Sequence, residues 1–294
     1  MIASRNDKIV YSINTTILLL LALLCLYPLL YIIASSLSSG SALNARKVFL
    51  WPIGFNTVSY TVLIKNAGLA NYFKNSIIFT VIGTMFCLVC TILCAYPLSR
   101  PHLIGRNKIS FFVMFTMIFG GGMIPNYLLI RSLGLIDTYW AIWLASLISP
   151  YNMMIMRNFF QNVPIEISEA AEADGCNEFR MLLQIYLPLS TAVIATLALF
   201  YGVGYWNSYQ SIMIYINDSK KYTLPVFIQQ IVFELNMLDV DTNVDVQQTV
   251  GESDIISEGV KSAGVVVLLV PMLIIYPFLQ KYFVKGVIIG AVKG

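Results

Sequence analysis

The chain has 294 residues, of which 58% are hydrophobic and only 11% are charged, and its mean hydropathy is +0.76. This composition excludes an ordinary soluble domain and indicates a polytopic membrane protein. The net charge of +3 is small and spread along the chain, so the sequence contains no basic stripe of the kind that binds nucleic-acid phosphates. We therefore expect a membrane environment and no nucleic-acid partner.

Long apolar runs recur along the chain. The first follows Arg5 and Lys8, and it is too long for a secretory signal peptide, whose apolar region is about 7 to 15 residues, whereas about 20 residues span a bilayer. The sequence predicts an all-α membrane protein. Its six expected transmembrane helices cover residues 11–37, 73–99, 108–130, 138–158, 183–208 and 262–284.

Basic residues in the short connections predict the orientation. Arg100, Arg106 and Lys108 lie in the turn between the second and third expected helices, and further lysines and arginines flank both ends of the chain. Basic residues favour the cytoplasmic side, so both termini are expected in the cytoplasm. The connection 165–182 is then cytoplasmic, and the connection 217–261 is an extracellular loop.

The acidic side chains of the connection 217–261 allow two interpretations: a solvated loop, or a docking surface for an external partner. These acids are Asp239, Asp241, Asp245, Glu252, Asp254 and Glu258.

Cysteine and histidine give little support for a catalytic or metal site. Cys87, Cys90 and Cys94 follow helical spacing, but no histidine or carboxylate accompanies them, so packing inside a helix is favoured over a metal site. The single histidine, His102, lies in a polar turn, where a solvated loop residue is expected. A membrane-embedded enzyme would need a catalytic cluster that these residues do not supply.

The segment 165–182 differs from the apolar runs on both sides of it. Glutamates such as Glu166 and Glu169 alternate with alanines and isoleucines, Gly175 interrupts the pattern, and a second apolar pattern begins at Phe179. Early acids suit the N-terminus of a helix, and glycine permits a turn that a side chain hinders. The sequence predicts a helix, a turn and a helix that sit in water against another protein.

The spacing within and after this segment resembles the EAA loop of permease subunits in bacterial ABC importers, in which the loop is a coupling helix seated in a cleft of the cytoplasmic ATPase. The resemblance assigns ATPase coupling to Glu169, Ala170, Ala171, Asp174, Gly175, Ile185, Leu187 and Pro188.

Three further stretches resemble carbohydrate-type permeases related to the smaller permease subunit of the maltose importer: Trp206–Asn207, Thr223–Pro225 and Gly120–Pro125. The last is similar to the oligosaccharide and lipoprotein-associated importers of Gram-positive bacteria. One departure is Ala192, where many relatives have a second proline.

This resemblance implies a single permease domain, 1–294, with the type I ABC importer fold in a bacterial cell membrane. It also implies a homologous second permease, two ATPase subunits that bind ATP and Mg, and an extracellular lipid-anchored solute-binding protein. The chain contains no GxxxxGK[ST] phosphate loop, so it is expected to be a transport subunit without enzyme activity or a cofactor of its own.

Aromatic and amide side chains near the end of the fifth expected helix are candidates for the substrate pathway, because aromatic faces and polar donors suit sugars. They are Tyr201, Tyr205, Trp206, Asn207 and Tyr209. The alternative is an interfacial aromatic belt that needs no ligand, and this is the favoured interpretation for Trp140 and Trp143.

The competing function is a secondary transporter or channel that works without an ATPase. Ion-coupled carriers usually place an ionisable residue inside the membrane, and the cores of the six expected helices contain none. A scaffold protein would leave the complete EAA pattern unexplained.

Overall fold

The computed structural model describes residues 5–66, 68–241 and 257–291, and every regular element in these ranges is a helix. The all-α class is therefore confirmed. By its internal contacts the chain divides into two compact units. The first consists of Met1–Ala70 and Phe227–Val270, and the second of Asn71–Val226 and Pro271–Gly294.

The first unit contains α1 (Arg5–Ser36), α2 (Gly40–Asn44), α3 (Val58–Asn66), most of α14 (Leu224–Asp241) and the part of α15 (Ser257–Ala291) that ends at Val270. The hydroxyl oxygens of Ser36 and Tyr60 lie 2.8 Å apart and join α1 to α3. A Cβ atom at Gly264 would lie 2.9 Å from the Ile228 side chain. Because residue 264 has no side chain, α14 and α15 pack closely there.

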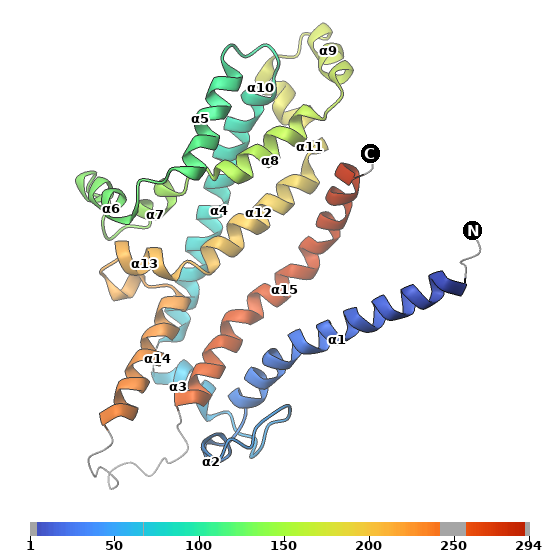
Figure 1. Cartoon of the computed structure of the whole chain (residues 1–294). Coiled ribbons are helices and arrows are strands. Elements are labelled where there is room, and N and C mark those ends of the chain that lie inside the picture. Colours follow the sequence, from blue (N-terminus) through green and yellow to red (C-terminus); the bar gives the residue numbers. More distant parts are fainter. Residues whose placement is uncertain (1–4, 67, 242–256, 292–294) are drawn as a thin grey trace. The chain divides into compact units, whose positions relative to one another are not determined.

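The second unit is built on α4 (Leu69–Ser99), a single long helix (Figure 1). Its residues contribute to two hydrophobic clusters. Shorter elements pack around it: α5 (Arg106–Ile118), α6 (Met123–Ser132), α7 (Trp140–Ala145), α8 (Pro150–Gln161), α9 (Ile165–Ala173), α10 (Glu178–Met181), η1 (Leu182–Tyr186), α11 (Leu187–Leu189), α12 (Thr191–Trp206), α13 (Tyr209–Tyr215) and η2 (Ser219–Lys221).

Two buried clusters form the core of this unit. In the first, Phe79 and Cys87 of α4 pack with Trp143 of α7 and Tyr205 of α12. The second gathers aromatic and flexible methionine side chains from α4, α8 and the residues around η1: Tyr96, Met153, Met156, Phe160, Met181 and Tyr186. Since α4 contributes to both clusters, it links the two ends of the unit.

Three described helices are long and apolar enough to cross a membrane: Val10–Ser36, Leu69–Ser99 and Glu258–Pro277. Two further candidates are bent pairs, Arg106–Ile118 with Met123–Ser132 at 114° and Glu178–Leu189 with Thr191–Trp206 at 83°. By length and composition the described residues thus provide three to five spans, and the predicted count of six and the cytoplasmic termini are not confirmed.

Two interruptions of the expected helices have local causes. The third expected helix is interrupted before Met123, where Gly122 has a φ of 82°. The fourth is divided into α7 and α8 by the residues that precede Pro150, the first residue of α8. A proline is favoured at a helix start but cannot continue a helix from before it, because it lacks the N–H and its ring clashes with the preceding turn.

The predicted extracellular loop 217–261 is partly helical in the structure, because α14 occupies Leu224–Asp241. Its segment Leu224–Phe233 is an apolar helix. Of the six acids proposed for the docking surface, only the side chain of Glu258 is described, and it accepts a hydrogen bond from Tyr31 at 2.9 Å. The acidic docking surface lies otherwise outside the described residues.

A polar clip joins the turn before α7 to the chain after α13. Asp137 has a left-handed φ of 63°, and its carboxylate accepts hydrogen bonds from the backbone N–H groups of Asn217 and Asp218 at 3.1 and 3.0 Å. The ammonium of Lys221 lies 2.7 Å from the other carboxylate oxygen. The hydrogen bond from Lys221, followed by that from Asp218, lowers the pKa of Asp137. The carboxylate is therefore ionised at neutral pH.

We predict that Lys221→Gln accelerates hydrogen exchange at the amides of Asn217 and Asp218 at neutral pH, because Asp137 loses its fixed cation. Lys220→Gln is the matched control, since Lys220 is exposed. Because folding lowers the pKa of Asp137, the wild-type protection is present at neutral pH and is lost as the pH falls through that pKa. Equal exchange in both variants at neutral pH would contradict the assignment.

Candidate functional site

The segment between α8 and α12 folds as the predicted helix, turn and helix (Figure 1). The turn has the hydrogen bonds of a Schellman motif: the N–H of Gly175 donates to the carbonyl of Glu172 at 3.0 Å, and that of Cys176 donates to Ala171 at 2.9 Å. Gly175 has a φ of +78°, yet no atom lies within 4 Å of the place where its Cβ would be. Glycine is therefore favoured here by the backbone conformation, not by a lack of space within this chain.

The helices before and after the turn form two arms, α9 and α10. The second arm begins at Asn177, whose side chain caps α10 by accepting a hydrogen bond from the N–H of Arg180 at 2.8 Å. The helix then widens into the π-helical turn η1 before Pro188. Pro188 has no N–H to donate to the carbonyl one turn back, and its ring crowds that turn, which is a physical reason for the altered register. Ile185 and Leu187 are half-buried beside the second hydrophobic cluster.

The residues expected to contact an ATPase divide by exposure. Glu169, Ala170, Asp174 and Gly175 are exposed, whereas Ala171 is half-buried against the second cluster. The first four therefore form an outward surface, which we call the docking face. Pro188 is also exposed, but it lies beyond the π-helical turn.

Sequence reasoning missed Arg100, which follows α4 directly. It was used only as one of the basic residues that predict the orientation, but its side chain is only 9% exposed. Its Nη1 donates to the hydroxyls of Ser168 and Tyr186 at 3.0 and 2.9 Å, and its Nη2 lies 2.6 Å from Glu172 and 3.4 Å from Glu178. One guanidinium thus contacts both arms of the segment. The sequence signal was a lone arginine at a helix end, which does not by itself identify distant partners.

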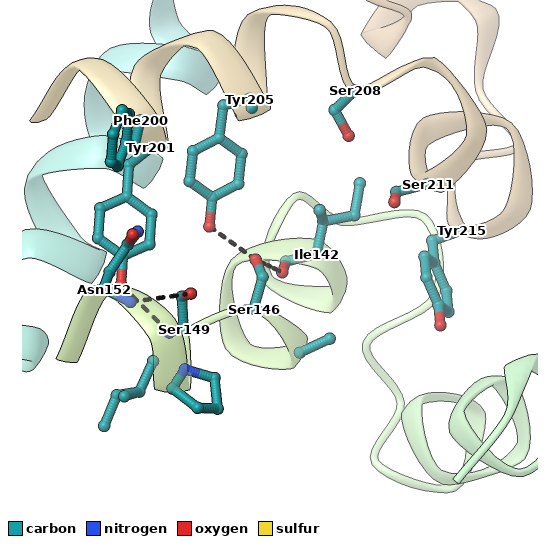
Figure 2. Close-up of a pocket in the computed structure, with 14 residues that line it drawn as sticks. Ile142, Ser146, Ser149, Asn152, Phe200, Tyr201, Tyr205, Ser208, Ser211 and Tyr215 are labelled. Atoms are coloured by element: carbon teal, nitrogen blue, oxygen red, sulfur yellow. Dashed lines mark hydrogen bonds between the residues drawn. The ribbon is translucent and has the colours of Figure 1, made fainter. Parts of the chain in front are cut away.

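A cavity of about 620 Å³ lies among α7, α8, α12 and α13 (Figure 2). Its lining residues are uncharged, and many are small or carry hydroxyl groups: Ile142, Ala145, Ser146, Ile148, Ser149, Pro150, Asn152, Phe200, Tyr201, Gly204, Tyr205, Ser208, Ser211 and Tyr215. One wall is the break between α7 and α8, and the opposite side includes the break between α12 and α13. Interrupted helices therefore shape the cavity.

Two tyrosines hold the cavity wall together. The hydroxyl of Tyr201 accepts a hydrogen bond from the backbone N–H of Ser149 at 3.1 Å and lies 2.7 Å from Thr91 Oγ1. The hydroxyl of Tyr205 lies 2.7 Å from Ser146 Oγ and 3.0 Å from Cys87 Sγ. These hydroxyls already have partners within the chain, so their rings are the parts best able to serve a ligand.

Other hydroxyls on the cavity wall lack such partners. Those of Ser208, Ser211 and Tyr215 make no hydrogen bond within the part of the chain that the structure describes. They can therefore donate to a polar ligand and accept from it. The sequence analysis did not select them, because isolated serines in an apolar run carry no signal until the helix breaks are known.

The predicted pathway residues do not all come together. Tyr201 and Tyr205 line the cavity, but Trp206 lies beside Phe73, with ring centroids 6.0 Å apart, and lines a different pocket. Asn207 is exposed and donates to the carbonyl of Val203 at 3.0 Å. Tyr209 is 37% exposed and is not part of the lining.

The tryptophans of α7 also separate. Trp143 is buried, stacks on Phe79 with centroids 5.9 Å apart, and donates from Nε1 to the Phe79 carbonyl at 3.2 Å. Its assignment to an interfacial belt was therefore wrong, because a buried ring belongs to the core. Trp140 remains 47% exposed and fits a belt position.

The cysteine and histidine expectations can be compared directly. Cys87 is buried between Tyr205 and the carbonyl of Ser146, which fits the packing role. Among the described residues, no group of three histidine, cysteine or acidic side chains could hold a metal ion. His102 is exposed in its turn.

These features together describe a class of protein: a multi-pass helical membrane protein with an uncharged cavity between broken helices and an acidic helical turn at one end. The chain belongs to the family described as "binding-protein-dependent transport system inner membrane component", whose model matches residues 4–289. It is therefore a permease of an ABC importer in a bacterial membrane, and it is not a catalytic enzyme. The family assignment confirms the resemblance and overrides the alternative of a secondary transporter.

Individual relatives cover nearly the whole chain. The polygalacturonan/rhamnogalacturonan transport system permease protein YtcP of Bacillus subtilis (strain 168) is 39% identical over 288 residues, 98% of each chain. Protein LplC of the same organism is 43% identical over 267 residues, 91% of this chain and 89% of LplC. A chain in the crystal structure of a bacterial ABC transporter that imports the acidic polysaccharide alginate has a TM-score of 0.84 and 31% identity, over 96% of this chain and 99% of that one.

We predict that Gly175→Ala makes the turn between α9 and α10 more sensitive to protease, whereas Gly175→Asn changes it little. An alanine in the left-handed region costs about 1–2 kcal/mol, and asparagine tolerates this region better. The measurement is limited proteolysis of the detergent-solubilised protein. Equal cleavage of both variants would show that the positive φ does not determine the order of the turn.

Proposed function

We propose that this chain forms one half of the transmembrane pathway of an ABC importer for a carbohydrate, of the oligosaccharide class, delivered by an external lipid-anchored solute-binding protein. The observation that carries the substrate class is the cavity of Figure 2. Its aromatic faces and free hydroxyls suit the apolar ring faces and hydroxyl rims of sugars, and its lining carries no charge. The relatives named for polygalacturonan, rhamnogalacturonan and alginate support this class.

The other half of the pathway is a homologous permease, and two cytoplasmic ATPase subunits bind ATP and Mg. Movement of the ATPases is transmitted to this chain through the segment 165–182, where the docking face contacts an ATPase. The support is local: Glu169, Ala170 and Asp174 are exposed around a turn that glycine keeps in one conformation. Small side chains on an ordered turn can seat closely in a groove of a partner protein.

Nucleotide-driven movement of the ATPases displaces this segment and switches the permease between two states, open to one side of the membrane or to the other. An equilibrium of this kind shifts only if ATP favours one state over the other. Ile185, Leu187 and Pro188 belong to the continuation of the second arm into α12, which connects the segment to the cavity wall.

The docking face can be tested by cross-linking. In a variant with Cys176 replaced by serine, a cysteine at Ala170 is expected to cross-link to an ATPase subunit of the assembled importer. A cysteine at Ser168 is the matched control, because this neighbouring side chain is only 2% exposed. No cross-link from position 170 or from the adjacent Glu169 would refute docking at this face.

The cavity can be tested by filling it. We expect Ser211→Leu to reduce oligosaccharide uptake into reconstituted vesicles while leaving basal ATP hydrolysis in place, because the larger side chain occupies cavity volume and removes a free hydroxyl. Ser132→Leu is the control, since Ser132 is exposed on α6 and outside the lining. Unchanged uptake by Ser211→Leu would count against the cavity as the substrate path.

A further inference from the structure

Arg100 lies between the end of α4 and the two helical arms of the segment 165–182, which we call the coupling segment. On α9 it contacts Ser168 and Glu172, and on α10 it lies 3.4 Å from Glu178. Tyr186, in η1, accepts a further hydrogen bond from the same guanidinium. Glu172 lies before the turn at Gly175 and Glu178 lies after it. A single buried cation therefore contacts the arms on both sides of that turn.

A second side chain of α4 strengthens this connection. Tyr96 lies one helical turn before Arg100, and its hydroxyl donates to the other carboxylate oxygen of Glu178. The rings of Tyr96 and Tyr186 also lie against the guanidinium, whose carbon is 5.9 and 5.8 Å from their centroids. Such cation–π contacts add attraction where the charge is removed from water. Tyr96 and Arg100 therefore both contact Glu178 of α10, and Arg100 also contacts α9.

The same helix reaches the cavity. Thr91 contacts the hydroxyl of Tyr201 at 2.7 Å, and Cys87 contacts that of Tyr205 at 3.0 Å. Residue 100 follows α4 directly, so at 1.5 Å per residue Thr91 lies about 14 Å and Cys87 about 20 Å from it along the helix. α4 is one helix from Leu69 to Ser99, with Pro97 in its last turn. A single helix thus connects the coupling segment with the two tyrosines of the cavity wall.

We propose that Arg100 is a positioning residue that locks both arms of the coupling segment to α4, so that ATP-driven displacement of the segment moves the cavity tyrosines through α4. This inference rests on the proposed function. Through α4, movement of the segment reaches the cavity by non-covalent contacts, in addition to the covalent connections through α8 and α12. Within the chain, the physical requirement is that the segment and α4 move as one body in both nucleotide states.

An arginine suits this role better than a lysine. Its planar fork presents several N–H donors at fixed angles, so it can bind a carboxylate with one terminal nitrogen and two hydroxyls with the other. An ammonium on a flexible stem cannot hold Glu172, Ser168 and Tyr186 in one fixed arrangement. Arg100→Lys should therefore retain the charge and lose part of the lock.

The first experiment measures whether the segment and α4 move together. Spin labels are placed on exposed Glu166 of α9 and exposed Val89 of α4, with the other reactive cysteines replaced. In the assembled importer with the native Arg100, the label distance is expected to stay the same with and without ATP. In Arg100→Gln the distribution of label distances is expected to broaden, and its mean is expected to change with ATP. A nucleotide-dependent distance with Arg100 in place, or no difference in Arg100→Gln, overturns the proposal.

The second experiment measures coupling. Arg100→Gln is expected to lower oligosaccharide uptake per ATP hydrolysed by about 2- to 30-fold, the range for residues that modulate coupling without touching either ligand, and Arg100→Lys should lie between it and wild type. Lys108→Gln, which removes an exposed cation from the start of α5, is the control. If Arg100→Gln does not assemble, Arg100→Lys, which keeps the charge but loses the planar fork, is the deciding variant. An unchanged ratio in the variant that assembles overturns the proposal.

The cross-link from position 170 separates this inference from the proposed function. If the cross-link to the ATPase is absent, docking at the segment is wrong. If it forms in both wild type and Arg100→Gln while the label distances and coupling ratio are unaffected, docking stands and the lock by Arg100 is wrong. If it forms and both readouts change, both statements are supported.

Discussion

The need to satisfy backbone hydrogen bonds in an apolar environment governs this structure. In lipid, a break in a helix exposes N–H and C=O groups that water cannot reach, so other groups must bind them. At the break between α7 and α8, the hydroxyl of Tyr201 accepts from the N–H of Ser149, and Cys87 donates to the carbonyl of Ser146. These side chains satisfy backbone groups at the break that forms one wall of the cavity. The hydroxyls of these tyrosines therefore stabilise the fold, and only their rings remain to contact a sugar.

This requirement changes the interpretation of the aromatic residues. Their abundance near the end of α12 indicated a sugar site, and two of the five candidates do reach the cavity. However, their hydroxyls are used inside the chain, so a sugar would meet their rings and would find its hydrogen bonds at Ser208 and Ser211. Selectivity for a neutral or an acidic sugar would then depend on groups outside this lining, because none of its side chains is charged.

Composition and local pattern predicted the helical class and the acidic turn, but they did not predict the bends. A hydropathy window records only that residues 108–130 and 138–158 are apolar. The conformations of Gly122 and of the residues before Pro150 divide these runs. The turn at Gly175 was predictable because a glycine between two amphipathic stretches is a local signal. The partners of Arg100 are 68 to 86 positions away along the chain, and a single sequence contains no record of such pairs.

The charges of the coupling segment therefore have two different roles. Glu169 and Asp174 face outward, where a partner protein can meet them, whereas Glu172 and Glu178 approach Arg100. The carboxylates at this cation are about half exposed, at 49% and 60%, while the guanidinium is 9% exposed. Surface ion pairs alone contribute little to stability, but a buried guanidinium left without its anions would be strongly unfavourable. The free-energy cost of separating the segment from α4 thus comes mainly from leaving the guanidinium of Arg100 unpaired. This cost favours movement of the segment and α4 as one body.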